Sequence, residues 1–425
     1  MTGEKPTKQA EIGYVPLHWD VYPLSYFTSR ITYGFTNPMP TTDIGPFMLT
    51  AKDVNGGRIN YKTARRTSWD AYQSLLTDKS RPRIGDVLLT KDGSIGRVAF
   101  CDRADVCINQ SVALLQPNER IDSRFLKFLL EGPHYQRRME GDSDGTTIKH
   151  IYITRVDKME VAVPPLAEQR AIASVLGALD DKIELNRRMN ATLEGMARAL
   201  FQSWFVDFDP VRAKLDGRLP EGMDAETAAL FPAEFEESEL GSIPKGWEVK
   251  KVSEFIERLS VGKKYEQKTV SPVGKIPVLD QGKSGVIGFH NDEPGVTATL
   301  DKPVAVFANH TCYMRLITYD FSTIQNVLPF VGSDVDTFWA YYATEGRLTF
   351  SEYKGHWPDF VIQESVVPPR KLTDLFGTIA KSIVAKIRNN EEQSRTLATL
   401  RDTLLPKLLS GEVCVADSPK EVDRL

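Results

Sequence analysis

Apolar side chains recur every seven residues in two long stretches of the chain. In the first stretch, which follows prolines at 164 and 165, the successive heptad positions hold Ile172, Leu179, Asn186, Leu193 and Leu200, with Val175, Met189 and Met196 between them. In the second stretch the equivalent positions hold Phe376, Ile383, Asn390, Leu397 and Leu404, with Ile379 and Leu400 between them. A heptad seam of about five repeats predicts a coiled-coil helix. We expect two helices of roughly 38 residues, each about 55–60 Å long.

The second half of the chain repeats the first. Residues 11–27, EIGYVPLHWDVYPLSYF, return at 239–255 as ELGSIPKGWEVKKVSEF, 228 positions later. The stretch that begins VPPLAEQRAIASVLGALDDKIELN at 163 matches VPPRKLTDLFGTIAKSIVAKIRNN from 367, 204 positions later. Each half is therefore a lobe followed by a long helix. A chain with an internal repeat presents two similar surfaces and so suits a pseudo-symmetric ligand. Duplex DNA is the commonest such ligand.

The two helices are expected to pack on each other, because neither small lobe is large enough to cover a whole seam. An antiparallel direction would place the two lobes at opposite ends of the pair, as a split DNA site would require. The alternative is that each helix folds onto its own lobe. Near the helix midpoints, a buried pair of Asn186 and Asn390 would fix the register, since a slip would leave both amides without partners. Antiparallel packing pairs opposite helix ends: Ile172 with Leu404, and Leu200 with Phe376. Pro406 should end or kink the second helix about a turn before Gly411.

Between the helices, short apolar runs separated by glycine and proline predict two β-rich lobes. Examples are GDVLLTKDGSIGRVAF at 85–100 and KPVAVFANHTCYMRLI at 302–317. The expected fold class is α+β, with two β-rich domains separated by two long antiparallel helices that form a coiled coil, and with a pseudo-twofold internal repeat. The domains are expected at 1–162 (first lobe), 163–205 (first helix), 206–238 (acidic linker), 239–366 (second lobe), 367–412 (second helix) and 413–425 (C-terminal tail).

Length and composition agree with a folded intracellular protein. A chain of 425 residues is too long for a domain with a single hydrophobic core and has the length of two domains. Neither a transmembrane run nor the apolar core of a signal peptide is present, so we expect a cytoplasmic protein with no membrane partner. Four cysteines, Cys101, Cys107, Cys312 and Cys414, have neither C-x-x-C spacing nor histidine pairing. They are expected to be idle thiols, with no zinc site and no disulfide framework.

The formal net charge of −4 is less basic than that of many DNA-binding proteins. Acidic residues concentrate in 206–239, however, whereas lysines and arginines cluster inside the lobes. Phosphate contact requires local rather than total charge, so a nearly neutral chain can carry two basic faces.

Candidate DNA contacts are polar and basic residues in and near glycine-rich turns, such as KDGSIGR (91–97) and DQGKSG (280–285). In the first lobe they are Lys62, Arg65, Arg66, Lys91, Ser94, Arg97, Thr146, Thr147, Lys149 and His150. In the second lobe they are Lys263, Lys264, Tyr265, Gln281, Lys283, Ser284, His310, Lys354 and His356. Arg or Lys would suit guanine and Gln would suit adenine, while the other groups would hold phosphates. The alternative for each is a solvated surface side chain.

The chain lacks the motifs of the common nucleotide and methyl-donor sites. DQGKSG has Pro277 where a phosphate-binding loop needs its first glycine, and no G-x-G-x-x-G follows a strand. The acid triplet that a nuclease would need is matched only loosely, by Asp336, Glu352 and Lys354. The six histidines show no ligand spacing. We therefore expect no catalytic residues, no metal and no cofactor.

Three segments carry a family resemblance: VAVPPLAEQRAIASVLGALDDKIELN (161–186), SWFVDFDPVRAK (203–214) and LGSIPKGWEVKKVSEF (240–255). They resemble the specificity subunit of type I restriction–modification systems, the HsdS family, over nearly the whole chain. The resemblance implies that each lobe is a target-recognition domain for one half of a split DNA site and that the helices act as a spacer. It also implies recruitment of two methyltransferase subunits and, in the full complex, motor-nuclease subunits. Base-reading residues do not carry over, because the lobes vary most in this family.

The sequence thus predicts a non-catalytic, sequence-specific double-stranded DNA-binding subunit of a type I restriction–modification complex. Two alternatives stay open at this stage. One is a stand-alone nuclease, and the other is a coiled-coil adaptor that binds only proteins.

Overall fold

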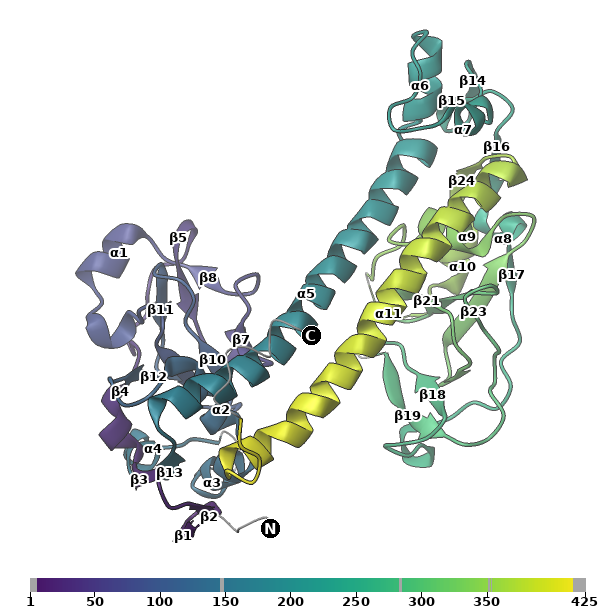
Figure 1. The fold of residues 1–425 in the computed structure, drawn as a ribbon. Helices are drawn as coiled ribbons and strands as arrows, with labels where there is room; N and C mark the ends of the chain where they lie inside the picture. Colours follow the sequence, from purple (N-terminus) through teal and green to yellow (C-terminus); the bar gives the residue numbers. More distant parts are fainter. Residues whose placement is uncertain (1–5, 146–148, 283–284, 351, 353, 416–425) are drawn as a thin grey trace. The chain divides into compact units, whose positions relative to one another are not determined.

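The computed structural model describes residues 6–145, 149–282, 285–350, 352 and 354–415. It forms two compact units. The first comprises Met1–Leu185 and Gln393–Leu425, and the second comprises Asn186–Glu392. Each long helix runs through both units, because α5 spans Leu166–Phe205 and α11 spans Arg370–Leu409 (Figure 1).

The first unit contains the first lobe. Its strands are β1 (Thr7–Ala10), β2 (Gly13–Pro16), β3 (Asp20–Pro23), β4 (Thr28–Tyr33), β5 (Thr42–Leu49), β6 (Val54–Asn55), β7 (Arg58–Ile59), β8 (Arg65–Arg66), β9 (Val87–Thr90), β10 (Val98–Phe100), β11 (Val106–Ile108), β12 (Val112–Pro117) and β13 (Glu160–Val163). Its helices are η1 (Leu24–Phe27), η2 (Ala51–Asp53), α1 (Trp69–Ser74), η3 (Asp78–Ser80), α2 (Ser123–Glu131), α3 (Pro133–Gly141) and α4 (Ile153–Asp157).

The second unit contains the second lobe. Its strands are β14 (Phe235–Ser238), β15 (Gly241–Pro244), β16 (Glu248–Lys251), β17 (Ile256–Arg258), β18 (Ile276–Leu279), β19 (Val286–His290), β20 (Val304–Ala308), β21 (Met314–Ile317), β22 (Ser322–Thr323), β23 (Val327–Gly332) and β24 (Glu364–Val367). Its helices are α6 (Asp209–Leu215), α7 (Ala225–Ala229), α8 (Val252–Phe255), η4 (Gln267–Thr269), α9 (Thr337–Thr344) and α10 (Trp357–Val361).

A four-stranded antiparallel sheet lies at the centre of each lobe, in the order β10-β9-β12-β4 in the first and β17-β23-β20-β21 in the second. Successive side chains of a strand point to opposite faces, so a strand covered on both faces reads as a continuous apolar run. On β9, Val87 and Leu89 face a core that includes α2 and the start of α5, whereas Leu88 faces β5 and β11. On β20, Ala305 and Phe307 likewise face a different core from Val304 and Val306.

A smaller three-stranded sheet packs on the second face of each central sheet. Its order is β11-β5-β8 in the first lobe and β19-β18-β22 in the second. Each small sheet contains one parallel pair, β5 with β11 and β18 with β22. The repeat read from the sequence is therefore present in the strand topology as well as in the matched segments.

The repeat also aligns the element boundaries. The strands β14, β15 and β16 begin 228 positions after β1, β2 and β3, while β24 and α11 begin 204 positions after β13 and α5. Both long helices have 40 residues. The predicted α+β fold with a pseudo-twofold internal repeat is confirmed.

The long helices pack antiparallel within each unit. In the first unit, Ile172 near the start of α5 shares a core with Leu405 near the end of α11, and Leu404 packs against the same core. In the second unit, Phe201 near the end of α5 lies 5.5 Å from Phe376 near the start of α11, measured between ring centroids. The antiparallel arrangement is confirmed, and the alternative of two helices folded separately is wrong.

Each helix end is covered by a tryptophan from the other copy of the repeat. In the second unit, Trp247 lies 6.0 Å from Phe205, the last residue of α5. In the first unit, a Cβ on Gly411, just after α11, would lie 3.3 Å from the Trp19 ring. Trp19 and Trp247 are matched residues of the repeat, and both are buried. Each half of the chain therefore completes the core of the other half.

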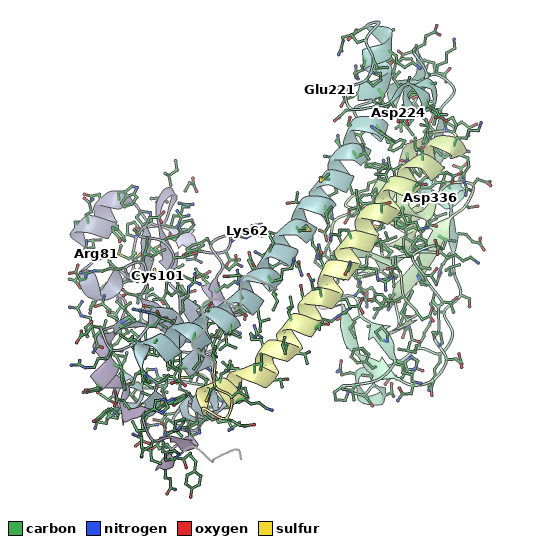
Figure 2. All side chains as sticks on the ribbon, viewed as in Figure 1. Lys62, Arg81, Cys101, Glu221, Asp224 and Asp336 are labelled. Carbon is green, nitrogen blue, oxygen red and sulfur yellow. The ribbon has the colours of Figure 1, made fainter. Side chains whose placement is uncertain are left out.

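Two details of the helical segments differ from expectation. Of the two effects expected of Pro406, ending the helix is wrong, because α11 continues through it to Leu409, and a kink stays a prediction. The segment 206–238 contains the short helices α6 and α7, and Phe208 and Phe231 bury their rings in the core of the second unit. The acidic residues Glu221 and Asp224 lie in the turn between these helices (Figure 2).

Candidate nucleic-acid interface

The turn between β9 and β10 holds three of the predicted contacts of the first lobe. Ser94 and Arg97 are exposed, as a DNA contact requires. Lys91 is not, because only 6% of the residue is exposed and its Nζ lies 3.1 Å from both Asp92 carboxylate oxygens, with the Tyr33 ring 5.2 Å away. An ammonium group held in this way supports the turn from within and is not available to a phosphate, which corrects the expectation for Lys91.

The segment before α4 is attached to this turn. The Asp92 carboxylate that binds Lys91 also binds Nδ1 of His150, and the Ile151 N–H donates to the Lys91 carbonyl at 2.9 Å. Lys149 is exposed and forms an ion pair with Glu140 at 2.9 Å. Thr146 and Thr147 lie outside the described residues.

Lys62, Arg65 and Arg66 lie in a separate region beside the small sheet. The Arg66 guanidinium stacks 3.8 Å from the Phe47 ring centroid and donates to the Gly45 carbonyl at 2.7 Å, so it is committed to local structure. Lys62 and Arg65 are exposed, and within the described part of the chain neither lies at ion-pair distance from a carboxylate. Figure 2 shows Lys62 and a further basic residue, Arg81, on opposite sides of the first lobe.

The equivalent turn of the second lobe, between β20 and β21, brings together residues that are distant in sequence. The His310 N–H donates to Oε1 of Gln281 at 2.9 Å, and the Thr311 hydroxyl donates to the Gln281 carbonyl at 2.6 Å. The backbone carbonyl of Asn309, the residue before His310, accepts from the N–H of His356 at 2.9 Å. Gln281, His310 and His356 thus surround one turn.

Side-chain burial separates the members of this group. His356 is 1% exposed, and its Nε2 lies 3.0 Å from the Glu352 carbonyl, so its ring is part of the core and not a DNA contact. Lys354 is exposed and is shared between Glu352 at 3.0 Å and Asp359 at 3.2 Å. Lys283 and Ser284 lie outside the described residues.

Lys263, Lys264 and Tyr265 flank a buried histidine. Tyr265 is 4% exposed, stacks on His290 with 4.2 Å between ring centroids, and donates its hydroxyl to Asp292 at 3.0 Å. Lys263 binds the same carboxylate at 3.1 Å. Burial lowers the pKa of His290, so its ring is neutral at pH 7. Only Lys263 and Lys264 of this group are exposed.

The two turns occupy equivalent positions. The first turn follows β9 and the second follows β20, which hold the same place in their central sheets. Each turn is hydrogen-bonded to the segment just before a short helix, and these two helices, α4 and α10, begin 204 positions apart. The exposed polar groups differ: Ser94 and Arg97 in the first lobe against Thr311 in the second. One scaffold therefore presents two different chemistries, as two different half-sites would need.

Ten of the predicted seam residues are buried or half-buried: Ile172, Leu179, Asn186, Leu193, Leu200, Phe376, Ile383, Asn390, Leu397 and Leu404. Met196 and Leu400, which were expected on the intervening seam positions, are exposed instead. The Asn186 side-chain amide donates to the Asn390 carbonyl at 3.3 Å, and the Asn390 amide donates to Oδ1 of Asn190 at 2.8 Å. The two asparagines meet, but through a backbone group and a third asparagine that the heptad pattern did not select.

The nuclease triplet does not form a metal site. The Asp336 carboxylate caps α9 by accepting from the N–H of Phe338 at 2.8 Å, and its backbone N–H donates to Thr373 of α11 at 3.1 Å (Figure 2). Across the residues that the structure describes, no three His, Cys, Asp or Glu side chains are grouped to hold a metal ion. Cys101, Cys107 and Cys312 are buried, Cys414 is exposed, and none of the four forms a disulfide within the described residues. Over the same residues, no helix is long and apolar enough to cross a membrane.

Sequence reasoning missed a group of aromatic and cationic side chains around the small sheet of the first lobe. The Arg103 guanidinium lies 5.0 Å from the Phe47 ring centroid and 5.4 Å from that of Tyr61. Trp69, at the start of α1, is 51% exposed, and its ring lies 5.7 Å from Tyr72. The available signal was Tyr61 next to Lys62 and Trp69 three residues after Arg66, since aromatic residues among cations are typical of nucleic-acid surfaces.

A duplicated lobe-and-helix architecture with two exposed polar turns defines a class of two-lobed recognition proteins. Comparisons with known proteins agree. Residues 43–195 match the family model of the type I restriction modification DNA specificity domain. The MjaIX type I specificity subunit of Methanocaldococcus jannaschii is 24% identical, over 97% of this chain and 98% of that protein. The HindI specificity subunit of Haemophilus influenzae is 26% identical, over 77% of this chain and 86% of that protein.

A solved structure has the same fold. The crystal structure of the type I restriction–modification S subunit from M. genitalium aligns with a TM-score of 0.55 and 18% identity, covering 92% of this chain and 96% of that one. The chain is thus similar to type I restriction–modification specificity subunits, over residues 43–195 in the family model and over nearly its whole length in the relative from Methanocaldococcus jannaschii.

Proposed function

We propose that this chain is the DNA-recognition subunit of a type I restriction–modification complex. The observation that carries the proposal is the duplication: one scaffold is built twice in one chain, with equivalent turns that expose different side chains. Each lobe reads one half of a bipartite target, and the paired helices α5 and α11 set the spacing between the halves. A single lobe would contact too few base pairs to select a rare site, whereas two lobes multiply their specificities.

The chain works without catalytic groups of its own. Two methyltransferase subunits bind equivalent surfaces of the two copies of the repeat, and motor-nuclease subunits join them in the full complex. Methyl transfer, ATP hydrolysis and cleavage belong to these partners. The overall charge of −4 is compatible with this role, because the exposed Lys62, Arg65 and Arg97 supply local positive charge.

The decisive experiment compares the purified chain alone with the chain co-expressed with its methyltransferase subunit. We expect DNA methylation at a bipartite sequence only in the second case, read out by sequencing modified bases in the host genome. Methyl transfer by the chain alone would contradict the proposal. Divalent-metal-dependent cleavage by the chain alone would favour the nuclease alternative. A complex without salt-sensitive DNA affinity would favour the protein adaptor.

A further inference from the structure

One exposed apolar residue of the first lobe is displayed on a rigid support. Ile44 is 83% exposed, and no other large apolar side chain in the described ranges is as exposed. It lies within β5, where both Thr42 and Phe47 pair with Arg66 of β8, so that the four residues 43–46 bulge out of the ladder. Bulges re-aim side chains and occur next to functional sites.

Three hydrogen bonds hold the bulge in place. The Arg66 guanidinium donates to the Gly45 carbonyl at 2.7 Å, the Thr42 hydroxyl donates to the Ile44 carbonyl at 2.9 Å, and the Thr67 N–H donates to the Pro46 carbonyl at 2.9 Å. Gly45 has a φ of +133°, and a Cβ there would lie 2.0 Å from the Thr67 carbonyl oxygen. Glycine is therefore required, and the strained turn keeps Ile44 in solvent.

The surroundings indicate what Ile44 meets. The exposed cation Arg65 adjoins the foot of the bulge, next to Arg66, and suits a phosphate backbone. The neighbour of Ile44 at the tip, Asp43, is exposed and acidic. A carboxylate repels phosphate but accepts from the amino group of cytosine, so the tip suits base edges while the foot suits the backbone.

We infer that the 43–46 bulge of the first lobe reads bases in duplex DNA, with Ile44 as the apolar contact that enters the groove. An isoleucine presented in this way either packs on a thymine methyl group or wedges between base steps. Asp43 contacts an adjacent amino group. This inference rests on the proposed function and names the specificity element of the first half-site.

The test uses the whole chain assembled with its methyltransferase subunits and two labelled duplexes. One duplex carries the bipartite site mapped from the host genome, and the other has the half read by the first lobe scrambled. Dissociation constants are measured by fluorescence anisotropy. Ile44→Ser should weaken binding to the intact site about ten-fold, the loss of burial of one branched side chain, and should leave binding to the scrambled duplex unchanged.

Two further variants control this result. Ile44→Leu keeps an apolar side chain and should bind the intact site within about threefold of the wild type. Leu219→Ser changes a 66%-exposed apolar residue outside both lobes and should leave both affinities unchanged. Both serine variants alter exposed positions, so their thermal melting should match that of the wild type.

The outcomes separate this inference from the proposed function. Suppose that the wild-type complex binds the intact duplex more tightly than the scrambled one. If Ile44→Ser then binds both duplexes as the wild type does, or loses the same affinity for both, the role of the bulge is overturned and the proposed function stands. A wild-type complex that does not discriminate would overturn the proposed function, and the role of the bulge with it.

Discussion

At the residue scale, the turn between β9 and β10 divides its two cations between different tasks. Lys91 is turned inward onto Asp92, which also holds His150, while Arg97 is exposed and contacts the structure through the Val54 carbonyl at 3.3 Å. One side chain supports the loop, and the other is presented to solvent. Substitutions of the two residues should therefore fail in different ways.

Lys91→Ala should lower the free energy of unfolding by about 1–3 kcal/mol, because Asp92 loses its charged partner. Arg97→Ala should leave stability unchanged, weaken binding to all DNA sequences alike, and reduce the slope of log affinity against log salt by about one. Denaturant titration and anisotropy at several salt concentrations measure the two effects. Equal stability loss in both variants would contradict the division.

The sequence predicted which polar side chains cluster near glycine turns, but not which of them point inward. KDGSIGR has the composition of an exposed loop, and nothing in it distinguishes Lys91 from Arg97. Burial of Lys91 depends on His150 and Tyr33, which approach it from 59 residues later and 58 residues earlier in the chain. Residue-level contacts of this kind depend on the tertiary fold and leave no local pattern.

At the element scale, an ionic cluster joins the first lobe to both long helices. Lys127 of α2 binds Glu131 and Asp180, each at 3.0 Å, and Asp180 of α5 binds Arg401 of α11 at 2.8 Å. Arg58 of β7 donates to the Asp180 carbonyl at 2.8 Å. Burial tends to raise the pKa of Asp180, but Lys127 and Arg401 outweigh burial and hold that pKa below its usual range.

Asp180→Asn should destabilise the first unit by about 3 kcal/mol at pH 7, because a charge-paired Lys127 with 9% side-chain exposure loses a partner. A lowered carboxylate pKa stabilises the fold above the unfolded value of about 4, and this contribution is lost as the pH falls through the lower folded value. The difference between wild type and Asp180→Asn should therefore shrink below about pH 4 in urea titrations.

The neighbouring Asp181 provides the control for this substitution. It is exposed, so Asp181→Asn should change stability by less than about 0.5 kcal/mol. If Asp180→Asn is as stable as the wild type at pH 7, the cluster does not stabilise the fold as described. The same conclusion follows if the stability difference between the two proteins stays the same in acid.

The positions of the two long helices could be predicted from the sequence, but the strand order of the lobes could not. The heptad seam, two prolines and the matched repeat gave both long helices, because a periodic apolar stripe is a local signal. It also gave the Asn186–Asn390 contact, but not Asn190, which joins it through the Asn390 side chain. The strand order of each lobe, with one parallel pair, depends on contacts between distant segments and was not deduced.

At the scale of the whole molecule, one lobe should be exchangeable without affecting the other. Each lobe has its own cores and its own link to a helix: Gln169 accepts from the Asp122 N–H at 2.7 Å in the first, and Thr373 accepts from the Asp336 N–H at 3.1 Å in the second. The helix residues of the two links, Gln169 and Thr373, are matched by the repeat, 204 positions apart. The recognition surfaces are thus mounted independently on a common frame.

Replacing residues 30–155 with the corresponding segment of a relative should change one half of the methylated sequence and keep the other half and the spacing. The segment lies between the hairpin of β1 and β2 and the start of α5, so the hairpin, both long helices and the whole second lobe are kept. Sequencing the modified bases in cells that carry the hybrid measures the outcome. A change in both halves would contradict independent reading, as would a change in neither.

The packing of Trp19 and Trp247 on the helix ends has a consequence for a chain that carries only one copy of the repeat. Because each half supplies the helix that closes the other half, a single copy would have an open core and would have to associate with a second identical copy. A chain that carries both copies needs no such association, and its two halves are free to differ from each other.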